Sequence, residues 1–213
     1  MDKPLIPEYL MDYIDSLVPP RLPEMQAMEE DAERMDFPIV GPASGYLCYQ
    51  MARMVNAKRI FEMGSGFGYS TAWFARAVIE NGGGEVYHVV WDEELSRQAL
   101  RHLTTLGYEG VVKFHVGEAV LALRQATGPF DLVFNDINKE DYADSLPVIA
   151  GKLRPGGLLI VDNMLWHGRI FDPQDKTPAT ESIRKLTDLL TRSPDWIASL
   201  IPVRDGVIVA FKK

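Results

Sequence analysis

The sequence is poor in cysteine and lacks any long hydrophobic run. Its only thiol, that of Cys48, excludes a disulfide framework and is typical of a reducing compartment. No apolar stretch approaches the ~20 residues that a membrane-spanning helix needs. The N-terminal segment carries acids and prolines where a secretory signal would have a basic start and an apolar stretch. We therefore expect a cytoplasmic protein that does not enter a membrane.

Positive charge is also scarce, because 22 lysines and arginines stand against 30 aspartates and glutamates, for a net charge of −8. Domains that bind nucleic acid through its phosphate backbone are usually basic. The composition therefore argues against nucleic acid as a partner, and equally against an anionic membrane surface.

The length of 213 residues predicts one domain. Hydrophobic residues make up 46% and charged residues 24%, as in ordinary folded proteins, which excludes a disordered, collagen-like or disulfide-rich chain. We expect a single domain over residues 1–213, with a helical segment at 1–37 and the core of the domain at 38–213.

Apolar runs of strand length alternate with segments of helical periodicity through most of the chain. We expect strands at residues 58–64, 85–91, 112–117, 130–136, 157–163, 195–203 and 206–213. We expect helices at residues 24–35, 45–56, 70–83, 93–107, 118–128, 139–153 and 178–193. This alternation predicts an α/β fold with a mostly parallel seven-stranded sheet, helices on both faces and an antiparallel edge at the last strand pair. Ligands of such sheets bind beyond the carboxyl ends of the strands, where the strand order switches.

The helix expected at 24–35 has Met25, Met28, Ala32 and Met35 at helical spacing. This spacing favours a helix that packs on the main body of the domain. A lid over the site or a dimer contact is the alternative.

The first expected strand leads into a turn that contains Gly64, Gly66 and Gly68. Glycines let the backbone approach a ligand closely, and the following helix N-terminus offers free N–H groups. A dinucleotide-binding turn would have a glycine where Tyr69 stands, so the NAD fingerprint is not matched. Glu62, just before the glycines, would repel a pyrophosphate but could hold an ammonium group. A turn that binds no ligand is the alternative.

The end of the second expected strand departs from nucleotide-binding folds, which usually place an acid there for the ribose hydroxyls. Val90 lies at this strand end, Trp91 follows it, and Asp92 is the first acid. Trp91 is a candidate to stack on an adenine ring, although a core or surface tryptophan would give the same pattern.

Side chains with oxygen atoms follow two further strands, with Asp136 after the fourth and Asp162 and Asn163 after the fifth. Two carboxylates and an amide carbonyl suit a hard cation such as Mg²⁺, Mn²⁺ or Ca²⁺, completed by water and substrate oxygens. The set has no thiolate or imidazole, which argues against zinc. Capping and turn formation would explain any one of these residues, but all three at two strand ends favour a cation site.

Lys139 lies three residues beyond Asp136 and is expected at the mouth of the same crevice. An amine in this position is a candidate general base for a hydroxyl held by the cation. An exposed lysine at a helix start is the alternative. The four histidines are scattered with no pair at ligand spacing, and we expect each to be structural.

Together these residues resemble the cation-dependent O-methyltransferases of the catechol and caffeoyl-CoA type, from about Pro38 to the C-terminus. The matching segments are Ala57–Gly64, Gly68–Ser70, Asp136 with Lys139 and Tyr142, Leu153–Gly157, Asp162-Asn163 followed by Leu165, Trp166 and Gly168, and Asp205-Gly206. The resemblance implies a class I Rossmann-like methyltransferase fold, S-adenosylmethionine (SAM) as methyl donor and a homodimer. It also implies a divalent cation, with Mg²⁺ expected first and Ca²⁺ or Mn²⁺ as alternatives.

The resemblance further implies a role for each matching residue. Glu62 would face the methionine part of SAM, with close approach at Gly64 and Gly66, and Val40 and Gly41 would line the donor pocket. Ser70 would bind the carboxylate end of the donor, and Glu118 and Ala119 would lie near its adenine. Asp136, Asp162 and Asn163 would bind the cation, with Asp136 also at the edge of the donor site. Lys139 would be the general base, and Trp166 would belong to the acceptor wall.

Two positions depart from the family pattern. The ribose-binding acid of the family falls at Val90, and a missing charged hydrogen bond costs ~1.5–3 kcal/mol, roughly tenfold to a hundredfold in donor affinity. Asp92 or a water molecule would have to compensate. The family often has a second acid at the position of Asn138, where asparagine keeps an acceptor and we expect a smaller effect.

The sequence therefore predicts SAM-dependent methylation of a phenolic or catechol hydroxyl on a small molecule. One alternative is methylation of a hydroxylated tRNA base, against which the acidic composition argues. Another is a noncatalytic domain that binds a partner or small molecule. Val90 motivates this last reading, and the retained cation and base residues argue against it. We expect acceptor specificity to lie in the N-terminal helices and in residues 164–178.

Overall fold

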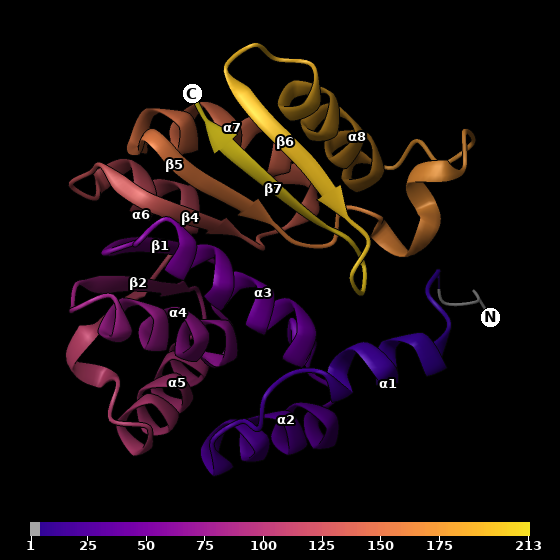
Figure 1. The fold of residues 1–213 in the computed structure, drawn as a ribbon. Helices are drawn as coiled ribbons and strands as arrows, with labels where there is room; N and C mark the ends of the chain where they lie inside the picture. Colours follow the sequence, from indigo (N-terminus) through magenta and orange to yellow (C-terminus); the bar gives the residue numbers. More distant parts are fainter. Residues whose placement is uncertain (1–4) are drawn as a thin grey trace.

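The computed structural model describes residues 5–213 and is built on one seven-stranded sheet in the order β3-β2-β1-β4-β5-β7-β6 (Figure 1). The strands are β1 (Arg59–Met63), β2 (Glu85–Val90), β3 (Val112–Val116), β4 (Phe130–Asn135), β5 (Leu153–Val161), β6 (Trp196–Ile201) and β7 (Val207–Lys212). Neighbouring strands run parallel, except that β7 is antiparallel to both β5 and β6. The predicted α/β fold with a mostly parallel sheet and an antiparallel edge is confirmed.

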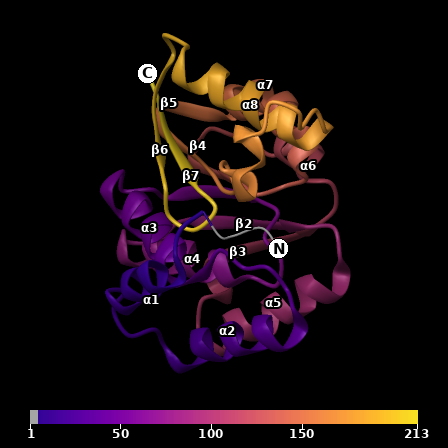
Figure 2. The same cartoon turned by 90° about the vertical axis from the view of Figure 1, so that its right-hand side faces the viewer.

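Helices cover both faces of this sheet (Figure 2). They are α1 (Glu8–Ser16), α2 (Pro23–Met35), α3 (Gly41–Met54), α4 (Tyr69–Glu80), α5 (Glu93–Thr105), α6 (Ala119–Gln125), α7 (Tyr142–Lys152) and α8 (Pro178–Thr191), with short 3₁₀ turns at Glu109–Val111, Lys139–Asp141 and Trp166–Phe171. Apolar side chains of α2 to α5 form one buried cluster, and those of α6 to α8 form the other. Among the described residues, no helix has the length and apolar character that a membrane span requires.

The strand order switches at β1, which lies between β2 and β4. The carboxyl ends of β1, β2, β4 and β5 therefore meet at one edge of the sheet, where a ligand is expected in a doubly wound fold. The chain leaves β1 toward α4 and leaves β4 toward α7, so the two helices lie on opposite faces. Because the segments that follow β1 and β4 diverge, a space opens between them at this edge of the sheet.

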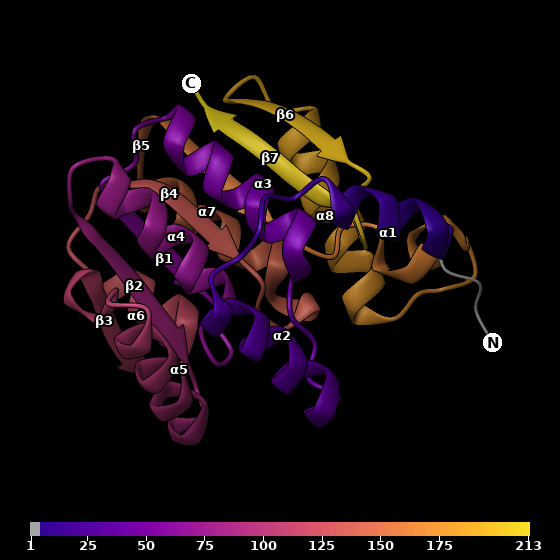
Figure 3. The same cartoon turned by 60° about the horizontal axis from the view of Figure 1, so that its bottom comes forward.

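Helices α1 and α2 lie on the same side of the sheet as α3 (Figure 3). Met25, Met28 and Ala32 of α2 are buried in the core cluster of that side, as their helical spacing predicts. Met35 is exposed, because α2 ends there and Asp36 takes a left-handed conformation. Helix α1 has no buried residue. Its contact with the main body includes the Asp15 carboxylate, which accepts a hydrogen bond from the Ala43 backbone N–H in the first turn of α3 (3.0 Å).

The fifth strand begins earlier than the expected range of 157–163. Helix α7 ends at Lys152, and Leu153 already pairs with Phe130 of β4. The register then shifts, so that Leu158 pairs with Leu132. Residues 154–157 form the irregular part of the strand. The sequence predicts a helix end and a loop there, because a proline and two glycines disfavour a regular strand.

Candidate active site

A glycine-rich turn joins β1 to α4 at residues 64–68. Gly64, Gly66 and Gly68 have positive φ angles of 88°, 51° and 95°, a conformation that glycine adopts at little steric cost. A Cβ atom on Gly64 would collide with the backbone carbonyl of Asp136. Glycine at position 64 therefore lets the turn pack against the chain that leaves β4.

A cavity of about 570 Å³ opens beside this turn, in the size range of small-molecule sites. The predicted site residues that line it are Val40, Gly64, Gly66, Ser70, Trp91, Glu118, Ala119, Asp136, Lys139, Asp162, Asn163 and Trp166. Glu62 and Gly41 do not line it. The folded chain thus brings residues that follow five strands, β1 to β5, to one cavity.

Glu62 is fully buried beneath the glycine turn. The Thr71 hydroxyl donates a hydrogen bond to its Oε2 atom, and Oε1 has no partner among residues 5–213. Burial raises the pKa of the Glu62 carboxyl to about 7, although hydroxyls of the turn and of the first turn of α4 oppose the shift. This buried carboxyl therefore has one oxygen without a partner among the described residues, although it does not line the cavity.

His88 of β2 completes a buried polar chain that the sequence did not reveal. Its Nδ1 atom lies 3.0 Å from the Thr71 hydroxyl oxygen, and burial lowers the pKa of the imidazole to about 3. Because Thr71 gives its hydrogen to Glu62, its oxygen accepts from a neutral imidazole protonated at Nδ1. Glu62, Thr71 and His88 come from β1, α4 and β2, so no spacing along the chain predicts that they meet.

Gly41 contacts an arginine instead of the cavity. It has a φ angle of 70°, and a Cβ atom there would collide with the Arg204 guanidinium. Arg204, in the turn between β6 and β7, donates a hydrogen bond to the Ile39 carbonyl (2.6 Å). The arginine therefore ties the cavity wall around Val40 to the C-terminal hairpin.

Two carboxyl groups lie at the ends of β4 and β5, the half-buried Asp136 and the buried Asp162. The Lys139 Nζ atom lies 2.6 Å from Asp136 Oδ1. The Tyr142 hydroxyl donates to the Asp162 carbonyl (2.9 Å) and lies 3.5 Å from Asp136 Oδ1. Burial, followed by repulsion from Asp136, raises the pKa of the Asp162 carboxyl to about 7. A cation between such groups would relieve both the repulsion and the desolvation.

The predicted cation ligands fit a hard ion. The Oδ1 atom of Asp162 is buried and has no hydrogen-bond partner in the part of the chain that the structure describes. Asn163 follows with a φ angle of 58° and lines the same cavity as Asp136 and Asp162. No group of three or more His, Cys, Asp or Glu side chains within residues 5–213 is placed to hold a metal ion. The predicted set has a different composition, two carboxylates and one amide.

The other end of the cavity lies at β2 and β3. Trp91 has 66% of its surface exposed at the rim. Glu118 lines the cavity and also caps α6, since its carboxylate accepts hydrogen bonds from the backbone N–H groups of Val120 (2.7 Å) and Leu121 (2.6 Å). The cap holds the Glu118 carboxylate at the start of the helix.

The remaining wall comes from the segment after β5. Trp166 and His167 line the cavity and take positive φ angles of 49° and 51°. The Asp205 carboxylate accepts a hydrogen bond from the His167 backbone N–H (2.6 Å), and the Leu165 N–H donates to the Asp205 carbonyl (2.8 Å). Asp205 thus holds a strained turn in place from the neighbouring hairpin.

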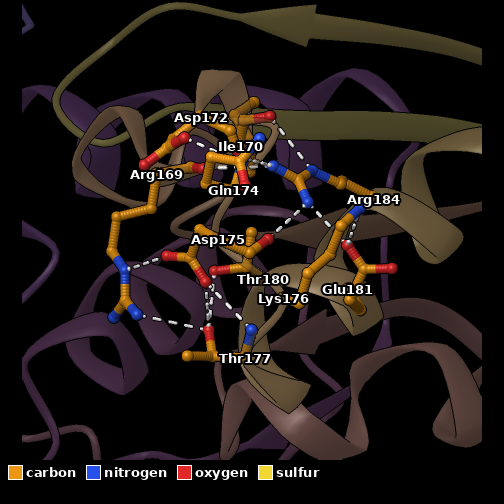
Figure 4. Close-up of polar contacts among 10 residues, drawn as sticks. All are labelled: Arg169, Ile170, Asp172, Gln174, Asp175, Lys176, Thr177, Thr180, Glu181 and Arg184. Atoms are coloured by element: carbon orange, nitrogen blue, oxygen red, sulfur yellow. Dashed lines mark hydrogen bonds and ion pairs between the residues drawn. The ribbon is translucent and has the colours of Figure 1, made fainter.

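Arg184 of α8 organises the loop that follows this wall (Figure 4). Its guanidinium donates to the carbonyls of Ile170 (3.1 Å), Asp172 (2.5 Å) and Asp175 (2.7 Å). Asp175 in turn accepts from Arg169 Nε (2.6 Å). Arg184 also donates to Glu181 Oε1 (2.6 Å), three residues earlier on α8. The sequence gives no signal for its role in the loop, because its partners there are backbone carbonyls.

The chain matches the sequence profile of a family described as O-methyltransferase over residues 20–213. It is 30% identical to a catechol O-methyltransferase of Niastella koreensis over 183 residues, which cover 82% of each chain. It is 27% identical to a caffeoyl-CoA O-methyltransferase of Populus trichocarpa over 215 residues, which cover 93% of this chain and 86% of the relative.

A solved structure has the same fold. The O-methyltransferase TomG of Streptomyces achromogenes, determined in complex with SAM, superposes with a TM-score of 0.86 at 28% identity and covers 96% of each chain.

Proposed function

Because the chain belongs to the O-methyltransferase family, we propose that it transfers the methyl group of SAM to a phenolic or catechol hydroxyl of a small molecule, with the help of a divalent cation. One observation carries the proposal. Lys139 lies 2.6 Å from Asp136 in a cavity that also holds Asp162 and Asn163. A base and a set of hard oxygen ligands therefore face the same space as the glycine turn.

The donor half of the proposal rests on the glycine turn and the cavity beside it. SAM is present in the TomG structure, which shares this fold. The buried carboxyl of Glu62 lies beneath the turn, and one of its oxygens has no partner among residues 5–213, which suits the ammonium group of a bound amino acid. Bound SAM would supply an electrophilic methyl group.

The cation half rests on Asp136, Asp162 and Asn163, whose oxygens are of the type that Mg²⁺, Mn²⁺ and Ca²⁺ prefer. A cation held there would bind hydroxyl oxygens of the acceptor and lower their pKa. Asp136 also holds the Lys139 ammonium, so the same carboxylate positions both the cation site and the base.

In this mechanism the proton of the acceptor hydroxyl goes to the neutral amine of Lys139, whose own proton is first released to solvent, as a cation beside it would favour. The amine is tethered by Asp136 and by the Ile137 carbonyl (3.2 Å), which directs it to the cavity. Trp166 forms a flat wall next to the reacting hydroxyl, and its indole Nε1 is buried without a partner within residues 5–213. The site would accelerate the transfer mainly by holding oxygen and methyl group in line.

The proposal is tested by incubating the purified chain with SAM and a panel of catechols, with Mg²⁺ or with a chelator. We expect methylated catechol in the presence of Mg²⁺ and none after chelation. Turnover that survives chelation would remove the cation from the proposal. Failure of every acceptor together with failure to bind SAM would overturn the proposal as a whole.

The homodimer stays a prediction. Helix α1 has no buried residue and exposes Tyr9 and Tyr13, and Leu17 directly after it is also exposed, so an apolar surface is available for a second copy. Sedimentation of the purified chain would decide between a monomer and a dimer.

A further inference from the structure

The cavity wall at the carboxyl ends of β2 and β3 is mostly apolar, with Glu118 as its acid. It is formed by Val89, Val90, Trp91, Leu95 and Ala119, which follow or flank the carboxyl end of β2. Because β2 pairs with β1, this wall lies directly beside the glycine turn. In doubly wound folds the ribose of a bound nucleotide meets the chain at this strand end.

The carboxylates near this strand end already accept hydrogen bonds from the protein. Asp92 caps α5, where its Oδ1 atom accepts from the Leu95 N–H (2.8 Å). Both oxygens of Glu118 accept from backbone N–H groups of α6, those of Val120 and Leu121. Each acid therefore stabilises a helix N-terminus.

The backbone carbonyls at the end of β2 also carry hydrogen bonds. The Val89 carbonyl accepts from the N–H groups of Gly64 (3.2 Å) and Ser65 (3.0 Å). The Val90 carbonyl accepts from the Gly117 N–H (3.0 Å). Val90, only 5% exposed, is the side chain that faces the cavity at the position of a ribose-binding acid. Asp92 and Glu93, the acids that follow Val90, do not line the cavity, and Glu118, which does, caps α6 with both of its oxygens.

We propose that this chain holds the nucleoside of its methyl donor by stacking on Trp91 and by apolar contact with Val90, and does not read the ribose hydroxyls. This inference rests on the proposed function. A site that binds a hydroxyl through a dedicated polar group rejects an analogue without it, whereas an apolar site discriminates weakly. The donor class therefore includes adenosyl sulfonium compounds with altered ribose.

The test compares the affinities of S-adenosylhomocysteine and its 2′,3′-dideoxy analogue by calorimetric titration of the full chain. We expect the two dissociation constants to agree within about threefold, because no charged hydrogen bond is lost. A loss of tenfold or more for the dideoxy analogue, the range for a lost charged hydrogen bond, would overturn the inference.

Two variants add independent readouts. Val90→Glu should tighten binding of S-adenosylhomocysteine about tenfold without tightening that of the dideoxy analogue. The matched control is Val90→Gln, because glutamine has nearly the size of glutamate but no charge. It should give a smaller gain in affinity for S-adenosylhomocysteine. Trp91→Ala should weaken both ligands by the same factor, about tenfold, since stacking involves the base alone.

The outcomes separate this inference from the proposed function. Tight binding of S-adenosylhomocysteine with strong rejection of the dideoxy analogue would leave the methyltransferase proposal standing and refute the ribose inference. Failure of the unaltered chain to bind either ligand would overturn both. If Val90→Glu does not fold, the comparison of the two ligands on the unaltered chain still decides.

Discussion

Glu62 and His88 are joined through a single hydroxyl, that of Thr71, which donates to the Glu62 carboxylate and lies 3.0 Å from His88 Nδ1. All three side chains are fully buried. Burial shifts the two titrating groups in opposite directions, raising the pKa of Glu62 to about 7 and lowering that of His88 to about 3. Both residues are therefore neutral in the folded chain between these values.

Opposite shifts predict opposite contributions to the pH dependence of stability. Glu62 stabilises the fold below its unfolded pKa of 4.5, and this contribution is lost as the pH rises toward 7. His88 stabilises the fold above its unfolded pKa of 6.5, and this contribution is lost as the pH falls toward 3. Between pH 4.5 and 6.5 the free energy of unfolding should fall by about 1.4 kcal/mol per pH unit because of Glu62 and rise by the same amount because of His88. The two contributions should therefore cancel.

Variants that each change one of the two residues should reveal how Glu62 and His88 contribute separately to the pH dependence of stability. Relative to the unaltered chain, Glu62→Gln should gain stability with rising pH between 4.5 and 6.5, and His88→Gln should lose it. Urea unfolding at several pH values measures both. Because burial is the main cause of each shift, each should persist without the other group. Parallel pH profiles for the two variants would contradict the opposed titrations.

Replacing Lys139 by methionine should lower kcat by about 10²–10⁴-fold, the usual contribution of a general base. Methionine keeps the apolar stem but removes the amine that lies 2.6 Å from Asp136. Donor affinity should change much less, as titration with S-adenosylhomocysteine would measure. The matched control is Lys185→Met, which removes an exposed lysine of α8 that pairs with Asp144. An unchanged kcat in Lys139→Met would refute the base role.

Replacing Asp162 by alanine should abolish the response of the enzyme to Mg²⁺. The change removes the proposed ligand oxygen Oδ1, which is buried and has no hydrogen-bond partner in the described chain. Binding of Mn²⁺, followed by its paramagnetic signal, gives a readout independent of turnover. Asp144→Ala, at an exposed acid on α7, should bind and respond as the unaltered chain does. Full Mg²⁺-dependent activity in Asp162→Ala would exclude this residue as a ligand.

Alanine at Gly64 should destabilise the fold more than alanine at Gly83. Both glycines have positive φ angles, 88° and 95°, so both variants incur roughly 1–2 kcal/mol of backbone strain. A Cβ at Gly64 also collides with the Asp136 carbonyl, whereas a Cβ at Gly83 would meet no neighbouring atom within 4 Å in the described part of the chain. Overpacking adds about 1–3 kcal/mol. Equal midpoints in urea would contradict the close packing of the turn.

Replacing Arg184 by methionine should free the loop at residues 169–177. The guanidinium binds several carbonyls of this loop, and methionine offers no donor. The acceptor kcat/KM should fall by up to roughly a hundredfold through misplacement of the acceptor wall, while donor affinity should change little. Arg192→Met, which removes an exposed arginine paired with Asp188, is the control. Unaltered acceptor kinetics and unaltered resistance to proteolysis would show that the loop keeps its position without Arg184.

The predicted family, enzyme class and fold are confirmed. The cation, the catechol acceptor, the homodimer and the cytoplasmic location stay predictions. Trp91, Lys139 and the predicted cation ligands line one cavity, since residues that follow parallel strands must emerge at the same edge of the sheet. Val40 lines it from the segment that precedes α3. Glu62 and Gly41 lie beneath and beside that cavity, contacting Thr71 and Arg204 respectively.

The sequence by itself determined the order of the elements and the edge at which the chemistry gathers, because hydrophobic periodicity and strand-end residues are local properties of the chain. Only the tertiary structure decided which side chains share a hydrogen bond. His88 meets Glu62 through Thr71, and Arg184 meets carbonyls of a separate loop. These contacts join elements far apart along the chain, so they exist only after the helices and strands have packed.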